Sequence, residues 1–182
     1  MSNFQSLAEF EALKDQEKID LGIAETMLDR LCVTRLTAVL TRFTWLRKCY
    51  IRRWVNEIKK ISGRDVKLHL TCEEITPYML EEGVICFSKK DVYRVKKLLM
   101  LLAHETAHFV LMRDPNYEMI KQIDCEYKAM PWREQTMHSP VEYCANLVTI
   151  MILTRCQLVE KDQNKKEIIQ DCVISLNKQL TK

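Results

Sequence analysis

The spacing of apolar residues in the first third of the chain predicts helices. Apolar side chains recur at intervals of three and four through residues 3–30, which predicts one or two helices there. The same spacing runs from residue 35 to residue 61 and predicts one long helix, whose end is marked by Gly63. Residues 1–62 are therefore predicted to form an N-terminal helical region.

Two short segments in the middle of the chain have the pattern of strands. Residues 66–71 alternate between apolar and polar side chains, which places His69 on the side away from the apolar face and predicts that it is exposed. Residues 84–87 follow Gly83 and predict a second strand, whose edge is a candidate site for binding an extended peptide. The polar residues 73–82 predict a connection with a short helical turn near Pro77.

The second half of the chain is again predicted to be helical. Apolar spacing predicts a helix over residues 91–112, a shorter helix over 117–127 inside a long connection, and an amphipathic helix over 165–180. Ser139 and Pro140 are typical of the N-cap and first residue of a further helix, which is apolar on all sides and therefore predicted to be buried. The patterns together predict a mainly α fold (α+β) with a small sheet of two or three strands.

Composition favours one domain, or a core with a helical extension. Of the 182 residues, 47% are apolar, and only three are glycine and four are proline, which leaves little room for long linkers. The chain lacks both a signal-peptide pattern and a run of eighteen uncharged apolar residues, so we expect a cytoplasmic protein with no membrane partner. The eight cysteines include no C-x-x-C pair and are expected to be reduced and mostly buried.

Charge is distributed unevenly along the chain. The net charge is +3, but residues 1–29 carry two basic and seven acidic side chains, whereas residues 30–67 carry eleven basic and two acidic ones. Such asymmetry indicates either a surface for nucleic acid or another acidic partner, or packing of the acidic first helix against the basic second one. We favour the internal packing.

The motif H-E-x-x-H, formed by His104, Glu105 and His108, interrupts a strongly apolar helical segment. Residues four apart lie on one face of a helix, so the two imidazoles can bind one metal ion. Glu105 points to the same side and can activate a water molecule as a general base. Buried imidazole and carboxylate groups cost free energy unless a partner satisfies them, and a metal ion is such a partner. The alternative is a pair of core histidines with ordinary hydrogen-bond partners.

Zinc requires a third protein ligand, and Glu142 is the favoured residue. It lies in the first turn of the helix predicted from Pro140, and Asn146 shares its face and can hold one of the histidines. Ser139-x-x-Glu142 is also the pattern of a capping box, which is the other interpretation of Glu142. The rival ligands are His138, Asp124, Glu126 and Glu134. We expect Zn²⁺ as the cofactor, and the same ligands accept Mn²⁺ or another divalent ion.

These residues resemble a known family. Ala103-His104-Glu105-x-x-His108, followed later by Glu142-x-x-Ala145-Asn146 and an apolar helix, resembles the ImmA/IrrE metallopeptidases, and is similar to gluzincins more broadly. The resemblance covers about residues 84–155 and implies a zincin-like metallopeptidase domain over residues 63–182.

The resemblance implies specific roles for the motif residues. These are His104, His108 and Glu142 as metal ligands, Glu105 as the general base, and Asn146 as the residue that holds a ligand in place. Family members are typically intracellular proteases that often act on repressor proteins. The implied activity is zinc-dependent hydrolysis of peptide bonds in an intracellular protein, such as a repressor or another regulator.

Two other functions remain open at the level of sequence. One is a metal-binding domain with little turnover that serves regulation, and the other is a helical module that binds nucleic acid or protein through residues 30–67. The partner that we expect is a protein or peptide substrate, and nucleic acid is less favoured. The residue that stabilises the oxyanion is open among Tyr143, His138, Tyr127 and Arg133. The sequence does not predict an oligomeric state.

Overall fold

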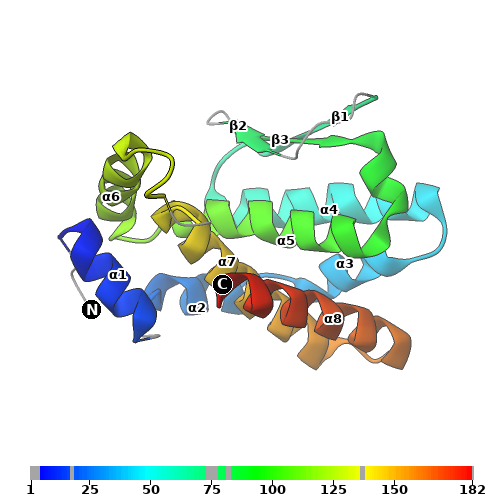
Figure 1. Cartoon of the computed structure of the whole chain (residues 1–182). Helices are drawn as coiled ribbons and strands as arrows, with labels where there is room; N and C mark the ends of the chain where they lie inside the picture. Colours follow the sequence, from blue (N-terminus) through cyan, green and yellow to red (C-terminus); the bar gives the residue numbers. More distant parts are fainter. Residues whose placement is uncertain (1–4, 17–18, 73–77, 81–82, 136–137, 182) are drawn as a thin grey trace.

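A computed structural model describes residues 5–16, 19–72, 78–80, 83–135 and 138–181. The described residues are mainly helical, as predicted. The α-helices are α1 (Leu7–Asp15), α2 (Gly22–Asp29), α3 (Val33–Thr37), α4 (Thr44–Ser62), α5 (Val95–Leu111), α6 (Tyr117–Ala129), α7 (Pro140–Val159) and α8 (Gln163–Leu180). The 3-10 helices are η1 (Ala38–Leu40) and η2 (Lys89–Tyr93), and the strands are β1 (Lys67–Thr71), β2 (Tyr78–Leu80) and β3 (Val84–Ser88). Figure 1 shows the sheet lying over α4 and α5, with α7 and α8 on the opposite side.

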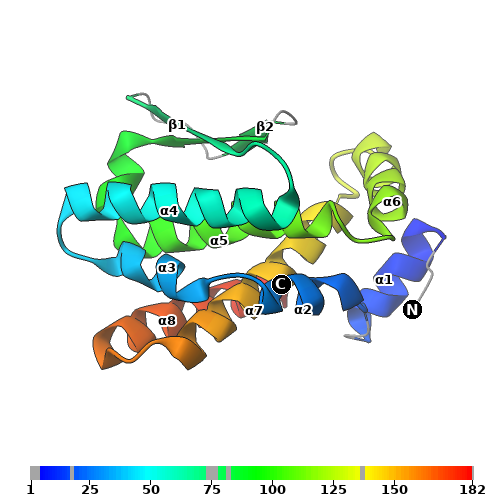
Figure 2. The same ribbon diagram turned by 180° about the vertical axis from the view of Figure 1, so that it is seen from behind.

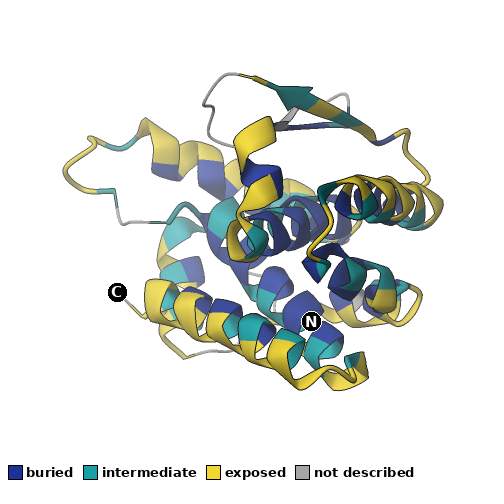
Figure 3. Cartoon of the chain, turned by 90° about the vertical axis from the view of Figure 1, so that its right-hand side faces the viewer, coloured by how far each residue is buried: buried dark blue, intermediate teal, exposed yellow. Residues whose placement is uncertain are grey.

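The core is centred on α5 and α7, which pack against each other. Both helices are apolar around much of their circumference because neighbouring elements cover them on several sides. Leu98 and Leu102 of α5 and Ile152 of α7 are fully buried. Figure 3 shows buried residues gathered in the interior and exposed residues on the outer sides of the helices. Residues from both predicted regions, 1–62 and 63–182, contribute to this core.

The sheet has the order β1-β3-β2, with β1 parallel and β2 antiparallel to β3. The strands predicted over 66–71 and 84–87 are confirmed as β1 and β3, and His69 is exposed as predicted. Gly83 has a φ of 81°, and a Cβ there would lie 2.5 Å from the Asp65 carbonyl oxygen, so only glycine fits before β3.

Two expectations for this part of the chain are wrong. The connection predicted over residues 73–82 contains a strand, β2, while the helical turn predicted near Pro77 lies outside the described residues. The strand at residues 84–87 was expected to offer an edge to a peptide. It is instead the central strand, which pairs with β1 along its whole length and with β2 at Val84, Ile85 and Cys86.

The long helix predicted over residues 35–61 is divided into α3, η1 and α4. The backbone is extended at Thr41, with φ −65° and ψ 150°, and again at Phe43. The guanidinium of Arg47, buried in α4, donates to the carbonyls of Thr41 and Val92, which holds this bend in place. The apolar spacing continues across the bend because both segments pack on the same core. Gly63, with a φ of 64°, ends α4 as predicted.

The helix predicted over residues 91–112 begins later than expected. Residues 89–93 form η2, whose N-cap Ser88 accepts a hydrogen bond from the Lys90 amide, and α5 starts at Val95. The lysines at the start of α5 have acidic partners, since Lys97 lies 2.7 Å from the buried Asp91 and Lys96 pairs with Asp171 of α8. These ion pairs explain a basic first turn, which the helix dipole alone would disfavour.

Among the described residues, the ion pairs and main helix contacts of the acidic N-terminal segment do not support the packing against the basic segment that we favoured. Helix α1 packs on α6, and Asp29 at the end of α2 pairs with Arg155 of α7. The cysteines are free, but only Cys86, Cys144, Cys156 and Cys172 are buried, so the expectation that most would be buried is wrong. Within the described residues, no helix has the length and apolar character needed to cross a membrane.

Candidate metal centre

Helix α5 presents His104 and His108 side by side. The two residues are one helical turn apart, and their Nε2 atoms lie 3.1 Å from each other with the rings nearly perpendicular. Between them, Thr106 points to the opposite side of α5, where its hydroxyl accepts a hydrogen bond of 3.0 Å from the Trp54 indole of α4. This contact fixes the rotation of α5 and keeps both imidazoles directed toward α7.

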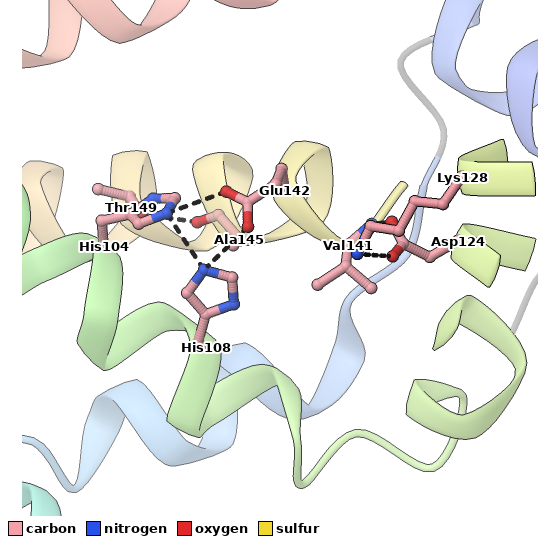
Figure 4. Close-up of polar contacts among 8 residues, drawn as sticks. All are labelled: His104, His108, Asp124, Lys128, Val141, Glu142, Ala145 and Thr149. Carbon is pink, nitrogen blue, oxygen red and sulfur yellow. Dashed lines mark hydrogen bonds and ion pairs between the residues drawn. The ribbon is translucent and has the colours of Figure 1, made fainter. Parts of the chain in front are cut away.

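Glu142 approaches the histidines from the first turn of α7. One carboxylate oxygen lies 3.2 Å from His104 Nε2 and the other lies 3.5 Å from His108 Nε2 (Figure 4). The side chain of Ser139 makes no capping bond to α7, so the capping-box interpretation of Glu142 does not describe this helix start. The carboxylate is directed at the imidazoles instead.

A neighbouring carboxylate caps α7 in place of Ser139. Asp124 of α6 is buried, and its Oδ1 accepts a hydrogen bond of 3.1 Å from the Val141 amide, while its Oδ2 lies 2.6 Å from the Lys128 ammonium (Figure 4). An acidic side chain at this position also complements the positive end of the α7 dipole. Helix α6 thereby holds the turn that carries Glu142.

The three groups differ in how burial and charge act on them in the metal-free protein. Burial lowers the pKa of His108 to about 4, so this imidazole is neutral at pH 7. Burial also acts to lower the pKa of His104, but its hydrogen bond with Glu142 and the charge of that carboxylate outweigh burial and raise the pKa above 6.5. The hydrogen bond from His104 holds the pKa of Glu142 below its ordinary value. The hydrogen bond between His104 and Glu142 therefore favours the charged forms of both groups.

Glu105 and Asn146 lie beside this group of three. Glu105 is buried, and burial raises its pKa to about 7, an effect that the nearby charge of His104 partly opposes. Asn146, one turn after Glu142 on α7, is also buried and lies close enough to His104 to help raise its pKa. The structure thus brings all five residues of the predicted site, His104, Glu105, His108, Glu142 and Asn146, into one place.

The candidate donor atoms lie close enough together to share one metal ion, although the Glu142 contacts to His104 and His108 use different carboxylate oxygens. Zinc binds imidazole nitrogen and carboxylate oxygen at about 2.0–2.2 Å, so two ligands of a tetrahedral ion lie about 3.3 Å apart. The observed separations of 3.1, 3.2 and 3.5 Å bracket this value. Among the described residues, His104, His108 and Glu142 are also the one group of histidine, cysteine or acidic side chains close enough to share an ion.

The rival ligands lie outside the cluster of three residues. His138, Asp124, Glu126 and Glu134 do not belong to the cluster, and Asp124 serves as the cap described above. The ring of Tyr143 packs edge-on against Phe10. Sequence reasoning missed the capping role of Asp124, because the bond joins residues of two different helices that are seventeen positions apart in sequence. The spacing of Asp124 and Lys128, i and i+4 on one helix, indicates their ion pair but not the third partner.

Comparison with known proteins identifies no relative of this chain. The chain matches no protein-family model, and neither the curated proteins nor the solved structures give a significant match.

Proposed function

We propose that this protein is a metallopeptidase whose zinc ligands are His104, His108 and Glu142. The observation that carries the proposal is the convergence of two imidazole nitrogens from α5 and a carboxylate from α7 at separations of 3.1–3.5 Å. Structural zinc sites use four protein ligands, whereas catalytic sites use three and leave one position open. A set of three ligands is therefore the set expected of a catalytic site.

A zinc ion held here would supply Lewis-acid chemistry, polarising a peptide carbonyl and making water nucleophilic near neutral pH. Glu105 is the proposed general base: its carboxylate accepts a proton from the attacking water and passes it to the leaving amine. Its buried environment favours a carboxyl group that can hold a proton near neutral pH. The proposed role of Asn146 is to orient His104, which it neighbours from α7, as residues beside a metal ligand commonly do.

The resemblance to the ImmA/IrrE metallopeptidases and other gluzincins supports the choice of peptide hydrolysis as the reaction. Two helices that present H-E-x-x-H and a glutamate, with a small mixed sheet over the first helix, are consistent with a zincin-like core. The proposed substrate is an intracellular protein, and a repressor or another regulator is the kind of substrate that the resemblance implies. Among the described strands, β1 and β2 are the edge strands to which an extended substrate segment can add.

Metal analysis combined with a matched pair of glutamate variants tests the proposal. Purified protein is expected to contain or take up one zinc ion per chain, and His104→Ala is expected to abolish uptake. Glu105→Gln should retain the metal and lose roughly 10²- to 10⁴-fold in cleavage of a peptide library, because the general base is gone. The control is Glu126→Gln, since Glu126 is exposed on α6 and lies outside the cluster.

The outcomes separate a peptidase from a domain that only binds metal. Metal uptake without cleavage of any peptide in the library would leave a regulatory metal-binding domain. Cleavage that survives Glu105→Gln would refute the proposed base. Failure of the wild-type protein to bind zinc or manganese at neutral pH would remove the proposal altogether.

A further inference from the structure

The outer side of α4 is a continuous exposed stripe rich in basic residues. Its exposed positions recur at intervals of three and four and are Trp45, Lys48, Cys49, Arg52, Arg53, Asn56, Lys59 and Lys60. We call this set the basic face, because it contains five lysine or arginine residues and no acidic residue. A helix of 19 residues is about 28 Å long. Figure 2 shows α4 in front of α5, with no other element lying across its outer side.

The acidic residues nearby neutralise only part of this charge. Lys60 lies 3.3 Å from Glu57, and Lys59 pairs with Asp65 beyond the end of the helix. The ion pairs formed by the described residues include no partner for Lys48, Arg52 or Arg53. Unpaired like charges on adjacent turns repel one another and destabilise a helix, so the basic face favours an anionic partner that relieves the repulsion.

The basic face has a cationic depression at one end and exposed aromatic rings at the other, an arrangement that suits a chain of nucleotides. At the C-terminal end lies a depression of about 620 Å³ whose charged lining residues are Arg35, Arg53, Glu57, Lys59, Lys60, Arg64 and Asp65. Cations outnumber carboxylates there by five to two, and the depression is large enough for a sugar with its phosphate. At the N-terminal end, Phe43 and Trp45 are 64% and 66% exposed. Exposed rings beside cations provide surfaces on which unpaired bases stack.

Arg47 does not belong to this surface, although the sequence places it among the basic residues of the segment. It is buried and donates to the carbonyls of Thr41 and Val92. The apolar side of α4, including Ile51, Trp54 and Ile58, is buried in the core and cannot enter a lipid bilayer. A membrane-bound amphipathic helix requires such a side to be free.

We propose that the basic face of α4 binds single-stranded nucleic acid. Lys48, Arg52, Arg53, Lys59 and Lys60 contact phosphates along the helix, the depression near Arg64 receives a phosphate at one end, and Phe43 and Trp45 stack on bases at the other. Binding of this kind depends on charge and stacking and does not read sequence. It is separate from the proposed metal centre, which uses no residue of α4 as a ligand.

The test measures binding of labelled DNA and RNA strands of about 20 nucleotides by fluorescence anisotropy, over a salt range of about 50 to 200 mM. The variant Lys48→Glu/Arg52→Glu/Arg53→Glu is expected to bind at least about tenfold more weakly and to have a salt slope smaller by about 2, since each lost phosphate contact removes about 0.7. The matched control is Lys121→Glu/Lys161→Glu/Lys178→Glu, which changes net charge equally at exposed sites elsewhere and should bind within about twofold of the wild type.

Folding controls, a milder variant and competing ligands complete the experiment. Circular dichroism checks that both charge-reversal variants fold, and the milder Lys48→Gln/Arg52→Gln/Arg53→Gln variant should weaken binding in the same direction. His104→Ala is expected to bind the strands like the wild type, which separates this proposal from the metallopeptidase proposal. The proposal is overturned if wild-type protein does not bind either strand at low salt, or if both charge reversals weaken binding equally. Preference for polyglutamate or for vesicles containing phosphatidylserine over the oligonucleotides would also overturn it.

Discussion

Asp124 on α6 accepts a hydrogen bond from the backbone amide of Val141, the residue that immediately precedes Glu142. The bond spans two helices and takes the place that the Ser139 side chain leaves vacant at the start of α7. Through this bond, α6 controls where the first turn of α7 lies relative to His104 and His108. A helix outside the ligand set therefore contributes to the geometry of the candidate metal centre.

Asp124→Ala is expected to reduce stability and metal affinity together. Loss of a helix cap costs about 1–2 kcal/mol in the free energy of unfolding, which denaturant titration of the metal-free protein measures. Zinc affinity is expected to fall by roughly 10-fold, because Glu142 loses its support. Ser139→Ala is the matched control and should change the unfolding free energy by less than about 0.5 kcal/mol, since that hydroxyl makes no capping bond. Equal losses of unfolding free energy in the two variants would show that Asp124 is not the main cap of α7.

Glu142→Gln is expected to weaken zinc binding strongly, because it removes a ligand. The loss should exceed that caused by replacing a residue that supports a ligand, such as Asn146 or Asp124. Loss of such a support costs roughly 10- to 100-fold in affinity, and loss of a ligand should exceed this. Competition with a chromophoric chelator measures the affinity. His138→Ala, which removes the rival imidazole outside the cluster, should leave affinity nearly unchanged. If His138→Ala weakens zinc binding strongly and Glu142→Gln does not, His138 is the third ligand.

Zinc binding is expected to release protons at mildly acidic pH. They come from His104, whose pKa is raised because its hydrogen bond with Glu142 and their opposite charges outweigh burial, and from the neighbouring Glu105, whose pKa burial raises to about 7. His108, with a pKa of about 4, is already neutral. Affinity should therefore fall as the pH decreases through the raised pKa of His104, where protons compete with the metal. Calorimetric titrations in buffers with different ionisation enthalpies count the protons. A heat that is independent of the buffer would show that zinc binding releases no proton and would contradict this prediction.

Alkylation is expected to divide the cysteines by burial. Burial raises the pKa of Cys144 to about 12 and that of Cys172 to about 11, so both remain thiols at pH 8, whereas Cys49, Cys72 and Cys125 are exposed. Iodoacetamide followed by peptide mass spectrometry should label the exposed three first in the native protein and all eight after denaturation. Early labelling of Cys144 would show that α7 opens far more readily than its packing indicates.

The positions of most helices could be predicted from the sequence because they depend on local spacing. The helices over 117–127 and 165–180 and the helix from Pro140 are present, and the end of α4 at Gly63 is correct. The bend between α3 and α4 escaped prediction because Arg47 holds it from within the core, and a buried arginine has no distinctive local pattern. Strand β2 was not predicted because three residues are too few to show the alternation of apolar and polar side chains that marks a strand.

The candidate site was more predictable than the fold around it. His104, Glu105 and His108 are defined by their spacing on one helix, and the structure places Glu142 and Asn146 next to them. Glu142 could be assigned only as one of two interpretations, since the choice between ligand and cap depends on where Asp124 lies. The charge asymmetry could not be assigned from sequence either, because it depends on which basic residues of α4 are exposed and on the partner that Arg155 provides for Asp29.

The hydrogen bond from Trp54 to Thr106 makes the intrinsic fluorescence of Trp54 sensitive to the position of α5. Trp54 is fully buried behind the helix that carries both imidazoles, whereas Trp45 and Trp132 are exposed, so its emission is expected at shorter wavelength than theirs. Any rearrangement of α5 alters the surroundings of this indole. Events at the histidines can therefore be followed in real time without attaching a dye.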